Sequence, residues 1–142
     1  MLDEARHAAC VDAWLAQAAE RLAPGPLVRL FQAALTTLWV RTETTLGEVT
    51  LSAIAERVLL NASERYPLFA SLTVEPGGGI QFRELGEQVR SGQGAQLREG
   101  VRYVLVELLT VLGNLTADIL TPELHAALSS VALEAQGEDR GS

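Results

Sequence analysis

The stretch from Ala95 to Leu120 constrains the fold most strongly, because its apolar residues follow a four-three-four-three-four spacing. This spacing places them in one row along a helix, and neighbouring valines and leucines widen the row to about half of the helix circumference. A helix this apolar must be covered, either by the rest of its own chain or by a second copy of it. Both alternatives stay open for the row, which consists of Val101, Leu105, Leu108, Leu112, Leu115 and Ile119.

Helices are also predicted before and after this stretch. The same apolar period covers residues 3–22, 26–45 and 51–66. Pro26 is expected as the first residue of the second helix and Gly47 as its end, with Thr50 or Ser52 capping the third. Thr121-Pro122-Glu123 is typical of the start of a helix, which should end near Gln136.

A β-hairpin is predicted over about residues 68–83, where the apolar period changes from that of a helix to that of a strand. The glycines of Pro76–Gly79 supply the reversing loop. A short helix over 84–90 and a polar loop at Ser91–Gly94 should follow. The fold class is therefore α+β and predominantly α-helical, with one domain over residues 1–136 and a disordered tail at 137–142.

The charge and composition limit the partners that we expect. A net charge of -7 repels phosphate backbones and anionic lipid, so neither nucleic acid nor a membrane surface is expected to bind. Arg102, Glu107 and Asp118 make the most apolar helix too polar to span a bilayer. The chain has a single cysteine and begins without the basic, apolar pattern of a secretory signal, which favours the cytoplasm. Its basic residues are all arginine, and Ala, Leu and Gly are abundant, a usage that favours a GC-rich bacterial genome.

Few residues are candidates for chemistry. His7 and Cys10 lie three residues apart on the first helix and could bind a metal or act as base and nucleophile, but packing is the favoured interpretation. His125 is expected to be exposed and inert, with a general base or a pH-sensitive contact as the alternatives. Haem ligation by either histidine has only the weak support of a lone His on a helix. Four polar residues of the long helix are interpreted as a solvated face rather than a cation site: Glu99, Glu107, Asn114 and Asp118. We therefore expect no catalytic, metal or cofactor site.

These observations favour a non-catalytic signalling or scaffold module that binds another protein through a helical groove or the hairpin edge, as a homodimer. The first alternative is a small-molecule sensor with an apolar pocket among its helices. The second is a degenerate winged-helix-like regulator, because helices followed by a hairpin with a glycine-rich tip resemble that fold. An enzyme ranks last, because the two histidines and the cysteine lack partners at useful spacing.

Overall fold

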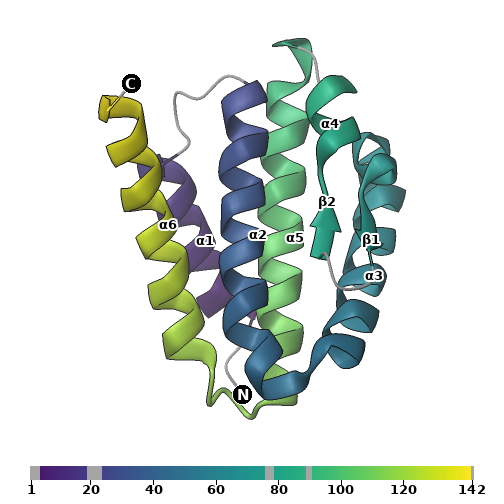
Figure 1. The fold of residues 1–142 in the computed structure, drawn as a ribbon, viewed down its shortest axis with the longest axis vertical. Helices are drawn as coiled ribbons and strands as arrows, with labels where there is room; N and C mark the ends of the chain where they lie inside the picture. The colour runs from purple at the N-terminus through teal and green to yellow at the C-terminus, as the bar shows by residue number, and fades with distance from the viewer. Residues whose placement is uncertain (1–3, 19–23, 76–78, 89–90, 142) are drawn as a thin grey trace.

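Two long helices stand side by side at the centre of the molecule, with one layer of structure on each side (Figure 1). They are α2 and α5; α1 and α6 cover one side, and α3 with the β-hairpin covers the other. This computed structural model describes residues 4–18, 24–75, 79–88 and 91–141. The elements are α1 (Glu4–Ala18), α2 (Pro24–Leu46), α3 (Glu48–Arg65), the 3-10 turn η1 (Pro67–Ser71), β1 (Thr73–Glu75), β2 (Gly79–Gln81), α4 (Arg83–Gln88), the 3-10 turn η2 (Ser91–Gln93), α5 (Gly94–Leu115) and α6 (Thr121–Gly141).

The predominantly helical α+β class and the predicted order of elements are confirmed. The two strands pair only with each other, antiparallel, with Val74 opposite Ile80. The buried apolar side chains form one contiguous cluster between the layers. Across the described ranges, every helix is too short or too polar to cross a membrane.

A single residue joins α2 to α3. Gly47 has a φ of 84°, a backbone conformation that side-chain-bearing residues rarely adopt. Its N–H donates to the Glu43 carbonyl and its own carbonyl accepts from Leu51, so the residue ends one helix and begins the next. The end predicted at Gly47 is confirmed. The cap predicted at Thr50 or Ser52 is wrong, because α3 already begins at Glu48.

The hairpin is shorter than predicted. Residues Pro67–Ser71 form a 3-10 turn, and β1 starts only at Thr73. The turn directs Phe69 into the core, where it is fully buried, whereas an extended strand would have placed it on the face opposite Leu72. From Leu72 onward the predicted alternation holds, since Leu72 is buried and Thr73 is exposed.

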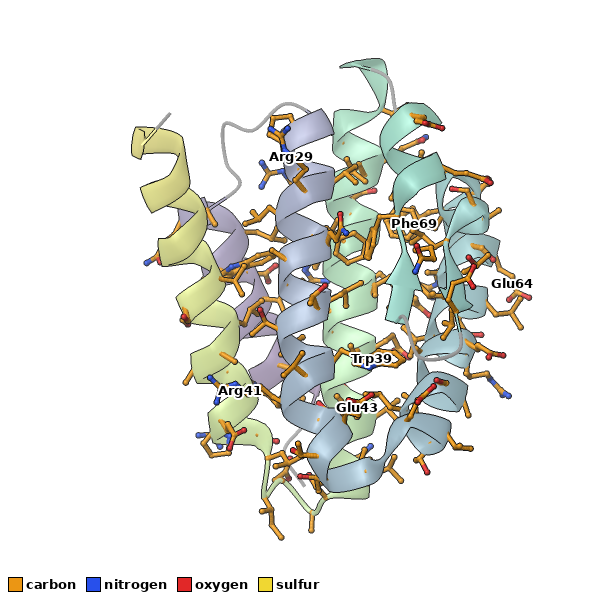
Figure 2. All side chains as sticks on the ribbon, in the orientation of Figure 1. Arg29, Trp39, Arg41, Glu43, Glu64 and Phe69 are labelled. Atoms are coloured by element: carbon orange, nitrogen blue, oxygen red, sulfur yellow. The ribbon has the colours of Figure 1, made fainter. Side chains whose placement is uncertain are left out.

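Three phenylalanines connect the hairpin side to the centre of the fold. The rings of Phe31 and Phe82 meet edge to face with centroids 5.2 Å apart, and those of Phe31 and Phe69 are 5.7 Å apart. Such aromatic pairs contribute about 1 kcal/mol each beyond the burial of their area. Phe69, labelled in Figure 2, also lies against Gly100 of α5, where the missing side chain leaves room for the ring.

Several helix ends differ from the prediction. α2 begins at Pro24 rather than at Pro26, because a helix tolerates proline in its first turn, where the backbone N–H groups have no partner within the helix. α5 ends at Leu115 rather than Leu120, because the chain must reverse there for α6 to pack along α1 and α2. At the other end, α6 runs on to Gly141, into the predicted tail at 137–142, whose Glu and Arg are good helix formers. The polar loop predicted at Ser91–Gly94 is instead a 3-10 turn followed by the first residue of α5.

Replacing Gly100 with alanine should destabilise the fold. A Cβ there would lie 2.5 Å from Cζ of Phe69, so the ring or the helix would have to move. We expect Gly100→Ala to lower the free energy of unfolding by about 1–3 kcal/mol, measured by urea titration. Gly92→Ala is the control, because nothing lies within 4 Å of its Cβ position. Equal stabilities for the two variants would contradict this packing.

Candidate functional site

The apolar row predicted on the long helix divides into a buried and an exposed part. Its first four members, from Val101 to Leu112, belong to the core of the monomer. They are therefore not available as a dimer seam while the chain is folded. Leu115 and Ile119 are 56% and 78% exposed, at the end of α5 and in the connection to α6.

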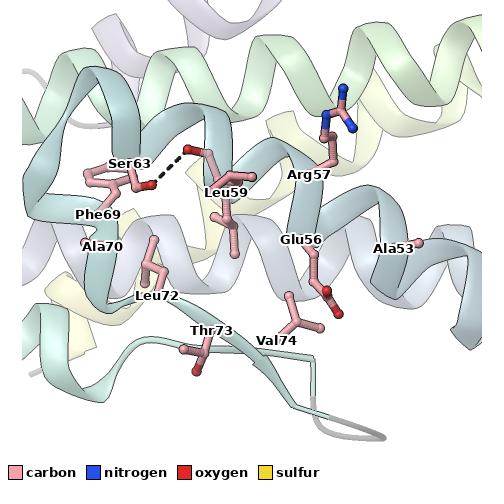
Figure 3. Close-up of a pocket in the computed structure, with 11 residues that line it drawn as sticks. Ala53, Glu56, Arg57, Leu59, Ser63, Phe69, Ala70, Leu72, Thr73 and Val74 are labelled. Atoms are coloured by element: carbon pink, nitrogen blue, oxygen red, sulfur yellow. Dashed lines mark hydrogen bonds between the residues drawn. The ribbon is translucent and has the colours of Figure 1, made fainter.

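A groove of about 710 Å³ runs between α3 and the segment from η1 to β1 (Figure 3). Its walls mix apolar and polar side chains. Leu59 and Glu56 point from α3 toward the strand that carries Val74, while Arg57 points away from it. Leu60, another lining residue, is 57% exposed. The residues that line it are Ala53, Glu56, Arg57, Leu59, Leu60, Ser63, Phe69, Ala70, Leu72, Thr73 and Val74.

A second site lies on the opposite side of the central helices, where α1 meets the first turn of α6. Nδ1 of His7 and Nε2 of His125 are 3.1 Å apart, and the two rings are nearly perpendicular. His7 is only 1% exposed, whereas His125 is half-buried. The prediction that His125 is exposed is therefore wrong, because the start of α1 packs against it. That it is inert stays a prediction.

The other nitrogen of His7 points into a small polar cluster around Gly113. A Cβ at Gly113 would lie 2.8 Å from Oδ1 of Asp118, 3.1 Å from Oγ1 of Thr121 and 3.2 Å from Nε2 of His7. The Thr121 hydroxyl donates to Oδ1 of Asp118 at 3.0 Å. Because Gly113 has no side chain, these three side chains can approach α5 closely at this position.

The α5–α6 connection is held in an uncommon conformation beside this cluster. Ala117 and Asp118 have φ values of 51° and 63°, in the left-handed region that favours glycine. Backbone hydrogen bonds hold the turn: among them, the N–H of Asp118 donates to the Gly113 carbonyl at 2.7 Å, and the N–H of Ala117 to the Asn114 carbonyl at 3.4 Å. The turn thus places the Asp118 carboxylate in the cluster around Gly113, which Nε2 of His7 also approaches.

The remaining candidates from the sequence do not come together. Cys10 packs against the core, and burial raises the pKa of its thiol, so it is a poor nucleophile at neutral pH. Glu99 and Asn114 are exposed on α5, whereas Asp118 belongs to the turn. Within the residues that the structure describes, no group of three or more His, Cys, Asp or Glu side chains is placed to hold a metal.

Sequence reasoning missed both the groove and the histidine pair. His7 and His125 are separated by 118 residues, and only the packing of α1 along α6 brings them together. The sequence did offer one indication, since His7 lies one turn before Val11 on the apolar side of α1. The groove depends on the 3-10 turn at Pro67–Ser71, which the apolar pattern did not predict.

Comparison of the chain with models of protein families, with curated proteins and with solved structures found no match. Its function is therefore inferred from its own residues.

Two charge substitutions separate the buried from the exposed part of the row. Leu112→Glu should abolish folding, because an unpaired carboxylate would replace a fully buried side chain. Ile119→Glu should leave the fold intact. Circular dichroism and urea titration measure both. A folded monomer from Leu112→Glu would show that the row is an interface after all.

Acid should weaken the fold partly through His125. Burial lowers the pKa of His125, and the neighbouring His7 and Arg6 lower it further. Because this pKa is lower in the folded than in the unfolded chain, the stabilisation is complete above pH about 6.5 and is lost as the pH falls through the folded-state value. The measurement is made in EDTA so that no metal ion binds the histidines. Under these conditions the free energy of unfolding should fall more between about pH 7 and pH 5 in the wild type than in His125→Gln. Identical pH dependence would contradict this.

Proposed function

We propose that this chain is a non-catalytic module that binds an extended segment of a partner protein in the groove between α3 and β1. The observation that carries the proposal is the open groove of about 710 Å³ beside a strand whose outer edge has no neighbouring strand among the described residues. A signalling or scaffold role follows from such binding.

The edge of β1 offers backbone groups to a partner. Within the part of the chain that the structure describes, β1 pairs with β2 along one edge and with no strand along the other, so we expect a third strand to be able to pair with that other edge. Peptides that add a strand in this way gain affinity from main-chain hydrogen bonds and specificity from pockets for alternate side chains. Leu60 and Val74, both lining the groove, would receive the apolar side chains.

The size and charge of the groove define the occupant. Its lining residues on α3 run from Ala53 to Ser63, a length of roughly 15 Å, which suits about four or five residues of extended chain. The net charge of -7 disfavours acidic segments. The expected occupant is therefore a short, extended, neutral or basic segment with apolar residues at alternate positions.

The homodimer expected from the sequence stays a prediction. Its interface would include only the exposed end of the predicted row. The C-terminal end of α5, its connection to α6 and the start of α3 lie at the same end of the molecule (Figure 1). Leu115, Ile119 and Val49 are exposed apolar residues of these segments. A second copy that covers these three residues would remove exposed apolar surface from water. In that case the molar mass measured by light scattering would fall to that of a monomer in Ile119→Glu.

A phage-displayed library of random peptides tests the groove directly. Peptides selected on the wild-type protein should bind Leu60→Asp at least about tenfold more weakly, because the charge enters the apolar wall. Val40→Asp is the matched control: Val40 is 59% exposed against 57% for Leu60, but lies on α2 outside the groove. Fluorescence polarisation measures the affinities.

Two results would contradict the proposed function. The first is a selection that enriches no peptide. The second is an enriched peptide that binds Leu60→Asp as tightly as it binds the wild type.

A further inference from the structure

His7 and His125 are placed like two neighbouring ligands of one metal ion. Nδ1 of His7 and Nε2 of His125 are 3.1 Å apart. Zinc binds histidine nitrogens at about 2.0–2.1 Å, so two nitrogens that share an ion at an angle between a right angle and a tetrahedral one lie about 2.9–3.3 Å apart. An ion would therefore fit between these rings with little movement.

We propose that His7 and His125 form a site for a late first-row divalent metal ion, with Zn²⁺ as the reference ion, that joins the start of α1 to the first turn of α6. The ion is bound by Nδ1 of His7 and Nε2 of His125. Water occupies the remaining coordination positions. This site is separate from the proposed peptide-binding groove, which lies on the other side of α2 and α5. Neither proposal depends on the other.

The groups around His7 favour the tautomer that binds a metal. Its Nε2 lies on the side of Oδ1 of Asp118 and Oγ1 of Thr121, since all three converge on the Cβ position of Gly113. Oxygen acceptors there favour a proton on Nε2, which leaves a lone pair on Nδ1 directed at His125. A lone pair facing a second imidazole nitrogen requires a proton or a cation between the two.

The same groups would support His7 as a ligand. Metal-binding histidines commonly direct their other ring nitrogen toward a carboxylate or carbonyl, which fixes the ring and raises its basicity. Oδ1 of Asp118 and Nε2 of His7 both lie close to the Cβ position of Gly113, and the turn at Ala117 and Asp118 holds the Asp118 backbone in place. His7 itself is buried, so its ring has little freedom to turn away.

The chemistry of the pair selects the ion. Imidazole nitrogens suit Zn²⁺, Ni²⁺ and Cu²⁺, whereas Mg²⁺ and Ca²⁺ prefer oxygen ligands. His125 is half-buried, so an ion and its water ligands can approach from its side. Two protein ligands make this an exchangeable site rather than a permanently filled structural one.

Imidazole nitrogen NMR of the untagged wild-type protein tests the site atom by atom. The chain has two histidines, so the spectrum holds two ring systems. Titration with Zn²⁺ should shift Nδ1 of His7 and Nε2 of His125 with a stoichiometry of one ion per chain, while the other two ring nitrogens keep their protons. Mg²⁺ should shift none of them. No change with Zn²⁺, or binding through Nε2 of His7, would overturn the proposal and leave a hydrogen bond only.

Thermal unfolding of matched variants gives an independent test. Saturating Zn²⁺ should raise the Tm of the wild type by about 5 °C or more relative to Mg²⁺, because the ion binds only the folded chain. His125→Gln should lose this rise. Glu123→Gln, two residues away in the same turn of α6, should keep it. Loss of the rise in Glu123→Gln, or its persistence in His125→Gln, would show that the donors are different.

Discussion

The contact between Phe69 and Gly100 determines how the hairpin side of the molecule is built. The ring needs a surface without a side chain on α5, and Gly100 provides it. To reach that surface, the chain after Pro67 must form a 3-10 turn rather than a strand. This 3-10 turn sets where β1 begins and therefore where the strand lies relative to α3. The groove is therefore a consequence of one aromatic ring reaching the centre of the fold.

The central pair of helices separates the two sites described above. The groove involves α3 and β1 on one side, and the histidine pair involves α1 and α6 on the other. Between them, the buried part of the α5 row belongs to the contiguous apolar core. A change at one site must therefore pass through packed apolar side chains to reach the other.

The sequence predicted those features of the fold that depend on residues close together in the chain. The helix periods and the end of the second helix at Gly47 are local requirements of the backbone, and the structure has them where the sequence predicted them. The burial of Phe69 could not be predicted in this way, because the packing of its ring in the core outweighs the local preference for a strand. The pairing of His7 with His125 depends on the packing of the first helix along the last. No local pattern records such a contact.

The packing of α1 has a consequence for the order in which the chain becomes folded during synthesis. The buried face of α1, which includes Val11 and Trp14, is covered by α5 and α6, which leave the ribosome after α2, α3 and the hairpin. Until they emerge, this apolar face lacks the two helices that cover it and remains a target for chaperones and for nonspecific association. α1 is thus synthesised well before the helices that bury it.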